Sequence, residues 1–325
     1  MKREVRVEDA VGMVLGHDLT QIVPGQFKGR LFKKGHVIKE EDIAALLSIG
    51  KEHIYVLSLD VGEVHEEDAA KRMAQGIMHE SLTFTEPHEG KITVKSVHDG
   101  LLVIDVDALR EINEIGDLVV VTKRTHTPVK AGMTLAGLRA IPLITTEDKL
   151  TAYDRIIATH RPLLRVDAFA AMKVGVVTTG SEVFKGRIED RFGPVLKAKL
   201  EAYGAQWMGQ QIVDDQTEGI VNAIYSFIAK DADIILVTGG MSVDPDDRSP
   251  GAISQVASSV VTYGMPMLPG SMSMVAYYHD VVLMGLPGAV IYDSVTAFDY
   301  LLPLILSGQK ITRKNIAALG HGGLL

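Results

Sequence analysis

One stretch indicates the fold of the C-terminal half of this chain: it reads IILVTGGMSVDPDDRSP at residues 234–250. Residues 234–237 are all apolar and mostly β-branched, which is typical of a strand buried on both faces. The Thr-Gly-Gly turn at 238–240 then lets the backbone turn sharply and approach a ligand closely. Acidic residues follow, and Ser249 with Pro250 fits a helix N-cap with proline at the first helical position. The stretch therefore predicts a ligand site beyond the carboxyl end of a strand.

Strands and helices alternate from about Met172 onward, which is the mark of a parallel sheet covered by helices. A buried strand at 174–177 is followed by a glycine turn, a helix through Leu196 and Leu200, and then further strand and helix pairs. We expect an α/β domain at 169–325 with three layers and a mostly parallel sheet. Its last helix is expected to run through Tyr292, Val295 and Phe298.

The front half has a different pattern, with short β-rich runs separated by glycine turns. We expect a small β-rich module at 1–60, followed by an α+β module at 61–168 whose segment 145–167 is a connector. These patterns name no chemistry.

The composition of the chain argues against several classes of function. The 33 Lys and Arg residues are outnumbered by 41 Asp and Glu, and the net charge of −8 disfavours nonspecific nucleic-acid binding. Cysteine is absent, which excludes disulfides, thiolate zinc sites and iron–sulfur clusters. No apolar run approaches the ~18 residues of a membrane-spanning helix. We expect a cytoplasmic protein that binds neither nucleic acid nor membrane.

Asp246 and Asp247 are the strongest candidates for chemistry. Neighbouring carboxylates repel each other unless a cation or hydrogen-bond donors compensate both. Mg²⁺ prefers oxygen ligands and commonly bridges to substrate phosphates. The alternative is a structural one, in which the pair caps a helix and bonds to Arg248.

Other acidic residues have a similar ambiguity. Asp190 precedes a predicted helix start, where the helix dipole alone favours a negative charge. Glu182 follows Gly180 on another loop, and Asp214 with Asp215 fits a helix cap. The amides after Pro287 and Gly288 are candidates to hold an anion, with a plain tight turn as the alternative.

Six segments in order resemble the molybdopterin-binding domain of the MogA, MoeA and gephyrin family of molybdenum-cofactor biosynthesis. They lie within residues 172–308 and are 178–182, 190–194, 214–215, 238–247, 267–270 and 285–288. In that family a three-layer α/β domain binds molybdopterin; one branch adenylylates it with Mg-ATP, and the other inserts molybdate.

The resemblance implies roles for individual residues. Asp190 and Asp247 are the implied catalytic residues, and Asp215, Asp246 and Asp247 are the implied Mg²⁺ ligands. The implied ligand-binding residues are Thr179, Gly180, Glu182, Thr238, Gly239, Gly240, Ser242, Pro269, Gly270, Pro287 and Gly288. The implied partners are molybdopterin or its adenylylated form, with ATP as a co-substrate, in a homo-oligomer.

Two departures from the family keep other functions open. The inserting branch has a Lys-Pro-Gly-Lys-Pro segment, which here reads Leu-Pro-Gly-Ser-Met at 268–272. Its Leu-Pro-Gly-Asn-Pro turn here reads Leu-Pro-Gly-Ala-Val at 286–290. We therefore predict a transferase acting by adenylyl transfer or a molybdate-insertion-like step. The alternatives are a nucleotide pyrophosphatase of the CinA type and a noncatalytic pterin-binding carrier or sensor.

Overall fold

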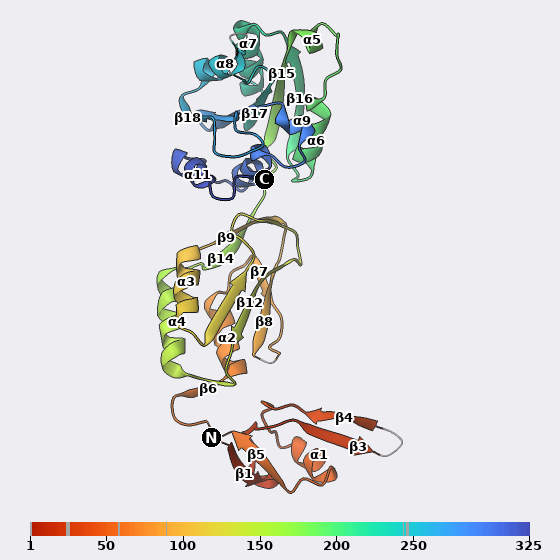
Figure 1. Cartoon of the computed structure of the whole chain (residues 1–325), viewed down its shortest axis with the longest axis vertical. Helices are drawn as coiled ribbons and strands as arrows, with labels where there is room; N and C mark the ends of the chain where they lie inside the picture. Colours follow the sequence, from red (N-terminus) through yellow and green to blue (C-terminus); the bar gives the residue numbers. More distant parts are fainter. Residues whose placement is uncertain (1, 24–26, 58, 89, 243, 245–246) are drawn as a thin grey trace. The chain divides into compact units, whose positions relative to one another are not determined.

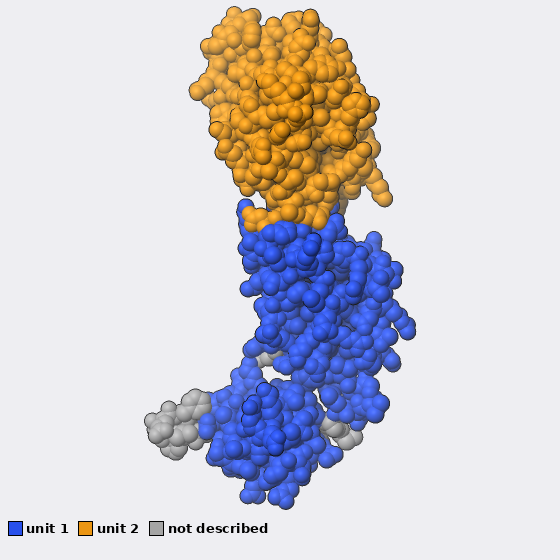
Figure 2. Space-filling model, turned by 180° about the vertical axis from the view of Figure 1, so that it is seen from behind, with its two compact units in different colours: residues 1–98, 102–166 blue, residues 99–101, 167–325 orange. Residues whose placement is uncertain are grey.

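The computed structural model describes residues 2–23, 27–57, 59–88, 90–242, 244 and 247–325. The chain divides into two compact units (Figure 2), unit 1 with residues 1–98 and 102–166 and unit 2 with residues 99–101 and 167–325. Both units combine sheets with helices, which confirms the mixed α/β class. The predicted division into three domains stays a prediction.

The first part of unit 1 is β-rich and has its own hydrophobic cluster. Its elements are β1 (Lys2–Arg6), η1 (Val7–Asp9), β2 (Val14–Leu15), β3 (Leu19–Val23), β4 (Phe27–Phe32), α1 (Asp42–Ser48) and β5 (His53–Leu57). Strands β1, β5 and β2 form one antiparallel sheet, and β3 pairs with β4. Buried Val7, Leu15, Leu46 and Val56 lie in the cluster that holds these elements together.

The second part of unit 1 packs helices against one face of an antiparallel sheet (Figure 1). Its elements are β6 (Glu63–His65), α2 (Glu66–Gly76), β7 (Leu82–Phe84), β8 (Lys91–Ser96), β9 (Gly100–Ile104), α3 (Val106–Glu114), β10 (Leu118–Thr122), β11 (Pro128–Val129), β12 (Thr134–Ala140), β13 (Ile144–Thr146), α4 (Glu147–Thr159) and β14 (Leu164–Ala168). One sheet has the order β10-β12-β8-β7, another has the order β11-β9-β14, and β13 pairs with β6.

The prediction of a connector at 145–167 is wrong, because this segment contains β13, α4 and β14. Leu150, Tyr153 and Ile157 recur at helical spacing and are all buried. The Tyr153 hydroxyl also donates a hydrogen bond to the Met73 carbonyl at 2.7 Å, so α4 is fixed to α2 inside the core. Charged residues and Pro162 obscured this apolar spacing in the sequence.

Unit 2 is organised around a six-stranded sheet with the order β16-β15-β17-β20-β19-β18. Its elements are β15 (Lys173–Thr179), α5 (Ser181–Phe184), α6 (Phe192–Glu201), β16 (Gln206–Val213), α7 (Thr217–Ile228), β17 (Ile234–Thr238), α8 (Ser249–Val256), β18 (Ser259–Tyr263), β19 (Met274–Tyr278), β20 (Val281–Leu286), α9 (Ala289–Tyr292), α10 (Ala297–Leu306) and α11 (Arg313–Ala318). Strands β16, β15, β17 and β20 run parallel, and β19 and β18 are antiparallel.

The centre of this sheet is buried as its sequence predicts. Every residue of β17 is buried, and α7 and α8 contribute side chains to a cluster that includes Val177 and Val237. Helix α7 approaches closely at Gly175, where a Cβ atom would lie 2.4 Å from the Phe227 ring. Glycine at this strand position therefore makes room for the aromatic ring.

The predicted final helix through Tyr292, Val295 and Phe298 is wrong as a single element. The chain forms α9, leaves the helical conformation, and begins α10 after Thr296. Thr296 and Asp299 form a capping box, in which the Asp299 carboxylate accepts from the Thr296 amide at 2.8 Å. This box stabilises a new helix start.

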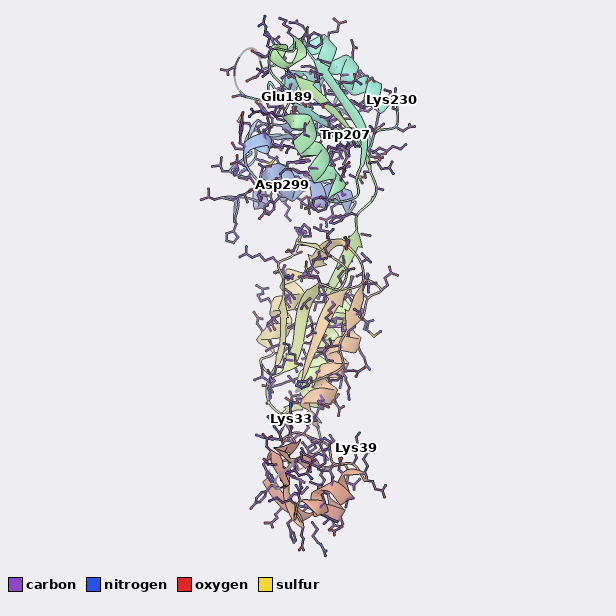
Figure 3. The ribbon with its side chains drawn as sticks, turned by 90° about the vertical axis from the view of Figure 1, so that its right-hand side faces the viewer. Lys33, Lys39, Glu189, Trp207, Lys230 and Asp299 are labelled. Atoms are coloured by element: carbon purple, nitrogen blue, oxygen red, sulfur yellow. The ribbon has the colours of Figure 1, made fainter. Side chains whose placement is uncertain are left out.

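We expect Gly175→Ala to lower the free energy of unfolding by ~2 kcal/mol, because the added methyl overpacks the space occupied by Phe227. Urea unfolding followed by tryptophan fluorescence measures this change in unit 2, since the only tryptophan, Trp207, lies on β16 (Figure 3).

The matched control is Gly251→Ala in α8, where a Cβ atom would meet nothing within 4 Å. This change should leave stability unaltered or raise it by up to ~1 kcal/mol. Equal stability of Gly175→Ala and the unsubstituted protein would contradict the close packing of α7 on β15.

Candidate functional site

Four loops begin together at the carboxyl edge of the parallel strands in unit 2. Thr178 on β15 is in register with Thr238 on β17, which is in register with Leu286 on β20. Thr178 is also in register with Ile212 on β16. The loops after β15, β16, β17 and β20 therefore start at one level of the sheet, where open α/β sheets bind ligands. They contain the predicted residues Gly180, Glu182, Asp215, Gly239, Gly240, Asp247, Pro287 and Gly288.

The loop after β17 passes very close to the end of β15. Gly239 has a φ of 84°, and a Cβ atom there would lie 2.2 Å from the Thr179 carbonyl oxygen. Only glycine combines this conformation with this approach. The Ser249 hydroxyl donates to the Gly239 carbonyl at 2.7 Å, and it lies 3.5 Å from the Thr179 hydroxyl.

The prediction that Ser249 is an N-cap is wrong. Helix α8 begins at Ser249 itself, and Arg248 occupies the cap position without a side-chain capping bond. The Ser249 hydroxyl is used instead to hold the glycine turn. The serine before proline therefore fixes the site loop and not the helix end.

Asp247 lies in the same loop and is half-buried. Its Oδ2 atom accepts from the Asp244 amide at 3.3 Å, and its own amide donates to the Asp244 carbonyl at 2.9 Å. Its Oδ1 atom has no bond to the described part of the protein. Asp246, its predicted partner in holding Mg²⁺, lies outside the described residues.

Tyr263, at the end of β18, ties this loop to the edge of the sheet. Its hydroxyl lies 3.1 Å from the Met241 carbonyl oxygen and 3.0 Å from that of Ser242, and donates toward both. Burial, and then the Asp247 carboxylate, raise the pKa of the Tyr263 hydroxyl. The hydroxyl therefore stays protonated and remains a donor at neutral pH.

Asp190 is held by three donors at the start of α6. Its carboxylate accepts from the Phe192 amide at 3.0 Å, the Gly193 amide at 2.9 Å and the Gln210 side chain at 2.8 Å. The Gln210 amide group also donates to the Thr178 hydroxyl at 2.7 Å. A chain of hydrogen bonds thus runs from Asp190 to the end of β15. This arrangement is the one expected if Asp190 stabilises the start of α6, which is its structural alternative. The predicted catalytic role stays a prediction.

The other predicted acidic residues differ in their hydrogen bonds and exposure. Asp215 Oδ2 accepts from the Ser181 amide at 2.8 Å, which joins the loop after β16 to the start of α5. Asp214 accepts from the Gln216 amide at 3.1 Å, next to the start of α7. Glu182 is exposed on α5. Among the described residues, no group of three or more Asp, Glu or His side chains is arranged to hold a metal ion.

The two Pro-Gly turns are both engaged with protein. The Val290 amide donates to the Pro287 carbonyl at 3.2 Å, and the Ile291 amide donates to Gly288 at 3.0 Å. The Pro269 carbonyl accepts from the Ala297 amide at 3.1 Å, at the start of α10. Because Met274 on β19 is in register with Gly285 on β20, the loop before β19, with Pro269 and Gly270, reaches the same sheet edge.

Sequence reasoning missed Gln210, Tyr263 and the role of the Thr178 side chain. Gln210 gave one signal, because a glutamine within a partly buried strand needs a polar partner. Tyr263 gave no signal in the sequence, since its hydrogen-bond acceptors are backbone carbonyl groups of the loop 21 and 22 residues earlier in the chain.

Comparison with known families now identifies this domain. Residues 175–307 match the family described as "Probable molybdopterin binding domain". The predicted resemblance of this part of the chain to the molybdopterin-binding domain family is therefore confirmed. Residues 4–58 match a domain of unknown function (DUF8806).

Relatives of the molybdopterin-binding domain include enzymes described as molybdopterin molybdenumtransferase. The one from Synechococcus elongatus is 24% identical over 205 residues, which is 58% of this chain and 51% of that protein. The one from Staphylococcus aureus is 30% identical over 122 residues, which is 35% of this chain and 29% of that protein. The chain thus spans about half the length of the first of these relatives and less of the second.

A solved structure is also similar, the molybdopterin biosynthesis enzyme MoaB from Thermus thermophilus. It has 20% sequence identity and a TM-score of 0.38, and the match covers 42% of this chain and 98% of that one. In the described part of this chain, no helix has the length and apolar character needed to span a membrane.

We expect Tyr263→Phe to speed amide hydrogen exchange in peptides covering 239–242 and 247–250, because the loop loses the donor that holds its carbonyl groups. Global stability should fall by no more than ~1.5 kcal/mol. Hydrogen exchange read by mass spectrometry measures the first effect, and thermal unfolding measures the second.

Tyr300→Phe is the control, since Tyr300 is exposed on α10 and its hydroxyl makes no bond to the described residues. Unchanged exchange at the loop in Tyr263→Phe would show that the hydroxyl does not hold it.

Proposed function

We propose that this chain binds molybdopterin at the carboxyl edge of β15, β16, β17 and β20, and acts on it by adenylyl transfer or a molybdate-insertion-like step. The observation that carries the proposal is the register of Thr178, Thr238 and Leu286, which brings the predicted loops to one edge. The match of residues 175–307 to the molybdopterin-binding family supports the ligand class. We also propose that helices cover both faces of the sheet as three layers.

The free carboxylate oxygens are the feature that suits a divalent cation. Asp247 and Asp215 each bond a backbone amide through Oδ2, so Oδ1 is left for another partner within the described protein. Hard cations such as Mg²⁺ prefer oxygen ligands of this kind. Asp247 would hold the ion together with Asp215, Asp246 or Asp190, and the ion would neutralise phosphate charge during transfer.

The protein's own part in the reaction is positioning. The Gly239 and Gly240 turn brings backbone amides close to the ligand without a Cβ atom in the way. Asp190, fixed through Gln210 to Thr178, keeps the start of α6 at the edge where the ligand is bound. Phosphoryl-type transfer depends mainly on such positioning and on charge neutralisation.

We expect Asp247→Asn to reduce Mg²⁺-dependent formation of adenylylated molybdopterin more than ~100-fold, as for the loss of a preorganised charge-stabilising group. Its melting temperature should change little, because its fold contacts involve one weak amide bond. Asp190→Asn should lower activity in the same way and also cost ~1 kcal/mol of stability, since its carboxylate caps α6.

Incubation of the purified chain with molybdopterin and Mg-ATP, with the product resolved by chromatography, measures activity. Asp280→Asn is the control, because Asp280 is exposed in the β19–β20 turn at the opposite edge of the sheet. If both site variants kept full activity and only Asp190→Asn had a lowered melting temperature, the proposed catalytic roles of Asp190 and Asp247 would be contradicted. The two aspartates would then have structural roles alone.

The pterin-binding carrier or sensor is the second candidate. It is favoured by the Leu-Pro-Gly-Ser-Met segment at 268–272, in which the lysines of the inserting branch are missing and Pro269 is bonded to α10. Tight molybdopterin binding without turnover in the same incubation would support it. Release of AMP from ADP-ribose would instead support the pyrophosphatase. We further propose that the protein is a cytoplasmic homo-oligomer. Sedimentation of the purified chain measures its oligomeric state.

A further inference from the structure

The sheet in unit 1 has one face that the helices do not cover. Along β8 the residues alternate, with Ile92 and Val94 buried among the helices and Lys91 exposed on the other side. Strand β12 continues this pattern, with Leu138 buried and Arg139 exposed. The outward face therefore consists of every second residue of β8, β10 and β12.

This face is hollowed at its centre. The hollow has a volume of about 320 Å³, and it is lined by Lys91, Thr93, Val121, Thr122, Lys123, Thr134, Leu135, Ala136 and Gly137. Gly137 lies between Thr93 and Val121 across the sheet. Gly137 has no side chain, so the bottom of the hollow stays open. A Cβ atom at residue 137 would contact the side chains on both sides, at 3.4 Å from Val121 and 3.8 Å from Lys91. Such a volume is at the lower end of small-molecule sites.

Four cations lie at the ends of this hollow. Lys91 and Lys123 line it, and Arg139 and Lys95 are paired across the strands with lining residues. Arg139 and Lys91 are paired across β12 and β8 at one end, and Lys95 and Lys123 lie at the other. None of the four forms an ion pair within the described part of the chain. Strands β7, β8, β10 and β12 contain no Asp or Glu. Lys91 and Lys95 are four residues apart on one strand, so their Cα atoms are ~13 Å apart.

A local basic face is unusual in a chain with a net charge of −8. Unpaired cations around a hollow favour an anionic ligand, and lysine, arginine and threonine side chains all bind phosphate oxygens. Strands β8, β10 and β12 contain no aromatic residue, so the stacking that single-stranded nucleic acids require is absent from these strands. The same lack of aromatic anchors disfavours a protein partner.

We propose that the outward face of β8, β10 and β12 is a binding site for a small molecule that carries phosphate groups. The phosphates bind to the lysine and arginine pairs at the two ends, and the middle of the ligand lies over Gly137. This inference does not depend on the function proposed for unit 2.

Isothermal titration calorimetry of the full chain with inorganic triphosphate, in the absence of divalent cations, tests the site. We expect binding by the unsubstituted protein, and affinity at least ~10-fold lower in the double variant Lys91→Gln, Lys123→Gln. Gly137→Val should also weaken binding of ATP, because the valine side chain fills the hollow. Valine is favoured in β-strands, so this substitution suits the conformation of β12.

Lys230→Gln is the matched control, since Lys230 is an exposed lysine after α7 in unit 2 (Figure 3). It should leave the affinity for triphosphate unchanged. The double variant should keep the adenylyl transfer proposed for unit 2, which separates the two sites. Far-ultraviolet circular dichroism checks that the variants are folded.

Three outcomes would overturn the proposal. These are the absence of triphosphate binding to the unsubstituted protein, equal affinity in the double variant, and tighter binding of a hexaglutamate peptide or a single-stranded oligonucleotide than of triphosphate. Loss of adenylyl transfer in the double variant is not expected.

Discussion

The site in unit 2 depends on one steric constraint, the passage of the Gly239 backbone across the end of β15. A Cβ atom at residue 239 would lie 2.2 Å from the Thr179 carbonyl oxygen, so a side chain at this position would force the two strand ends apart. With glycine, the loop after β17 turns over its neighbour and is held by the Ser249 hydroxyl. The position of Asp247 depends on this crossing, because Asp247 lies in the same loop, two residues before α8 begins at Ser249.

Thr178 and Thr179 connect the two sides of the sheet at this point. Successive residues of a strand point to opposite faces, so Thr178 meets Gln210 on one side and Thr179 meets Ser249 on the other. Gln210 extends the first contact to Asp190. The carboxylates at this edge are thus fixed by backbone and side-chain amide donors, which compensate for the loss of hydration when the carboxylates are partly buried.

Sequence predicted best where a local rule was enough. The apolar run at 234–237 and the glycines after it are where they were expected, because burial of a central strand and the steric demand of a tight turn are both visible in a single sequence. Ser249 was misassigned, since the choice between capping a helix and bonding Gly239 depends on a loop ten residues earlier. Gln210 and Tyr263 act through strand pairing, which a single sequence does not show. Helix α4 was missed because Pro162 and charged residues outweighed the spacing of Leu150, Tyr153 and Ile157.

The two contacts at the end of β18 have a mechanical consequence. Tyr263 holds the carbonyl groups of the loop that carries Asp247, and the neighbouring Thr262 accepts a hydrogen bond from Arg313 of α11 at 2.6 Å. Displacement of that loop would pull on the outermost strand, and the strand would carry the strain to a helix near the end of the chain. The loop at one rim of the sheet and α11, which begins 51 residues after Thr262, are thereby joined through adjacent residues at the end of one strand.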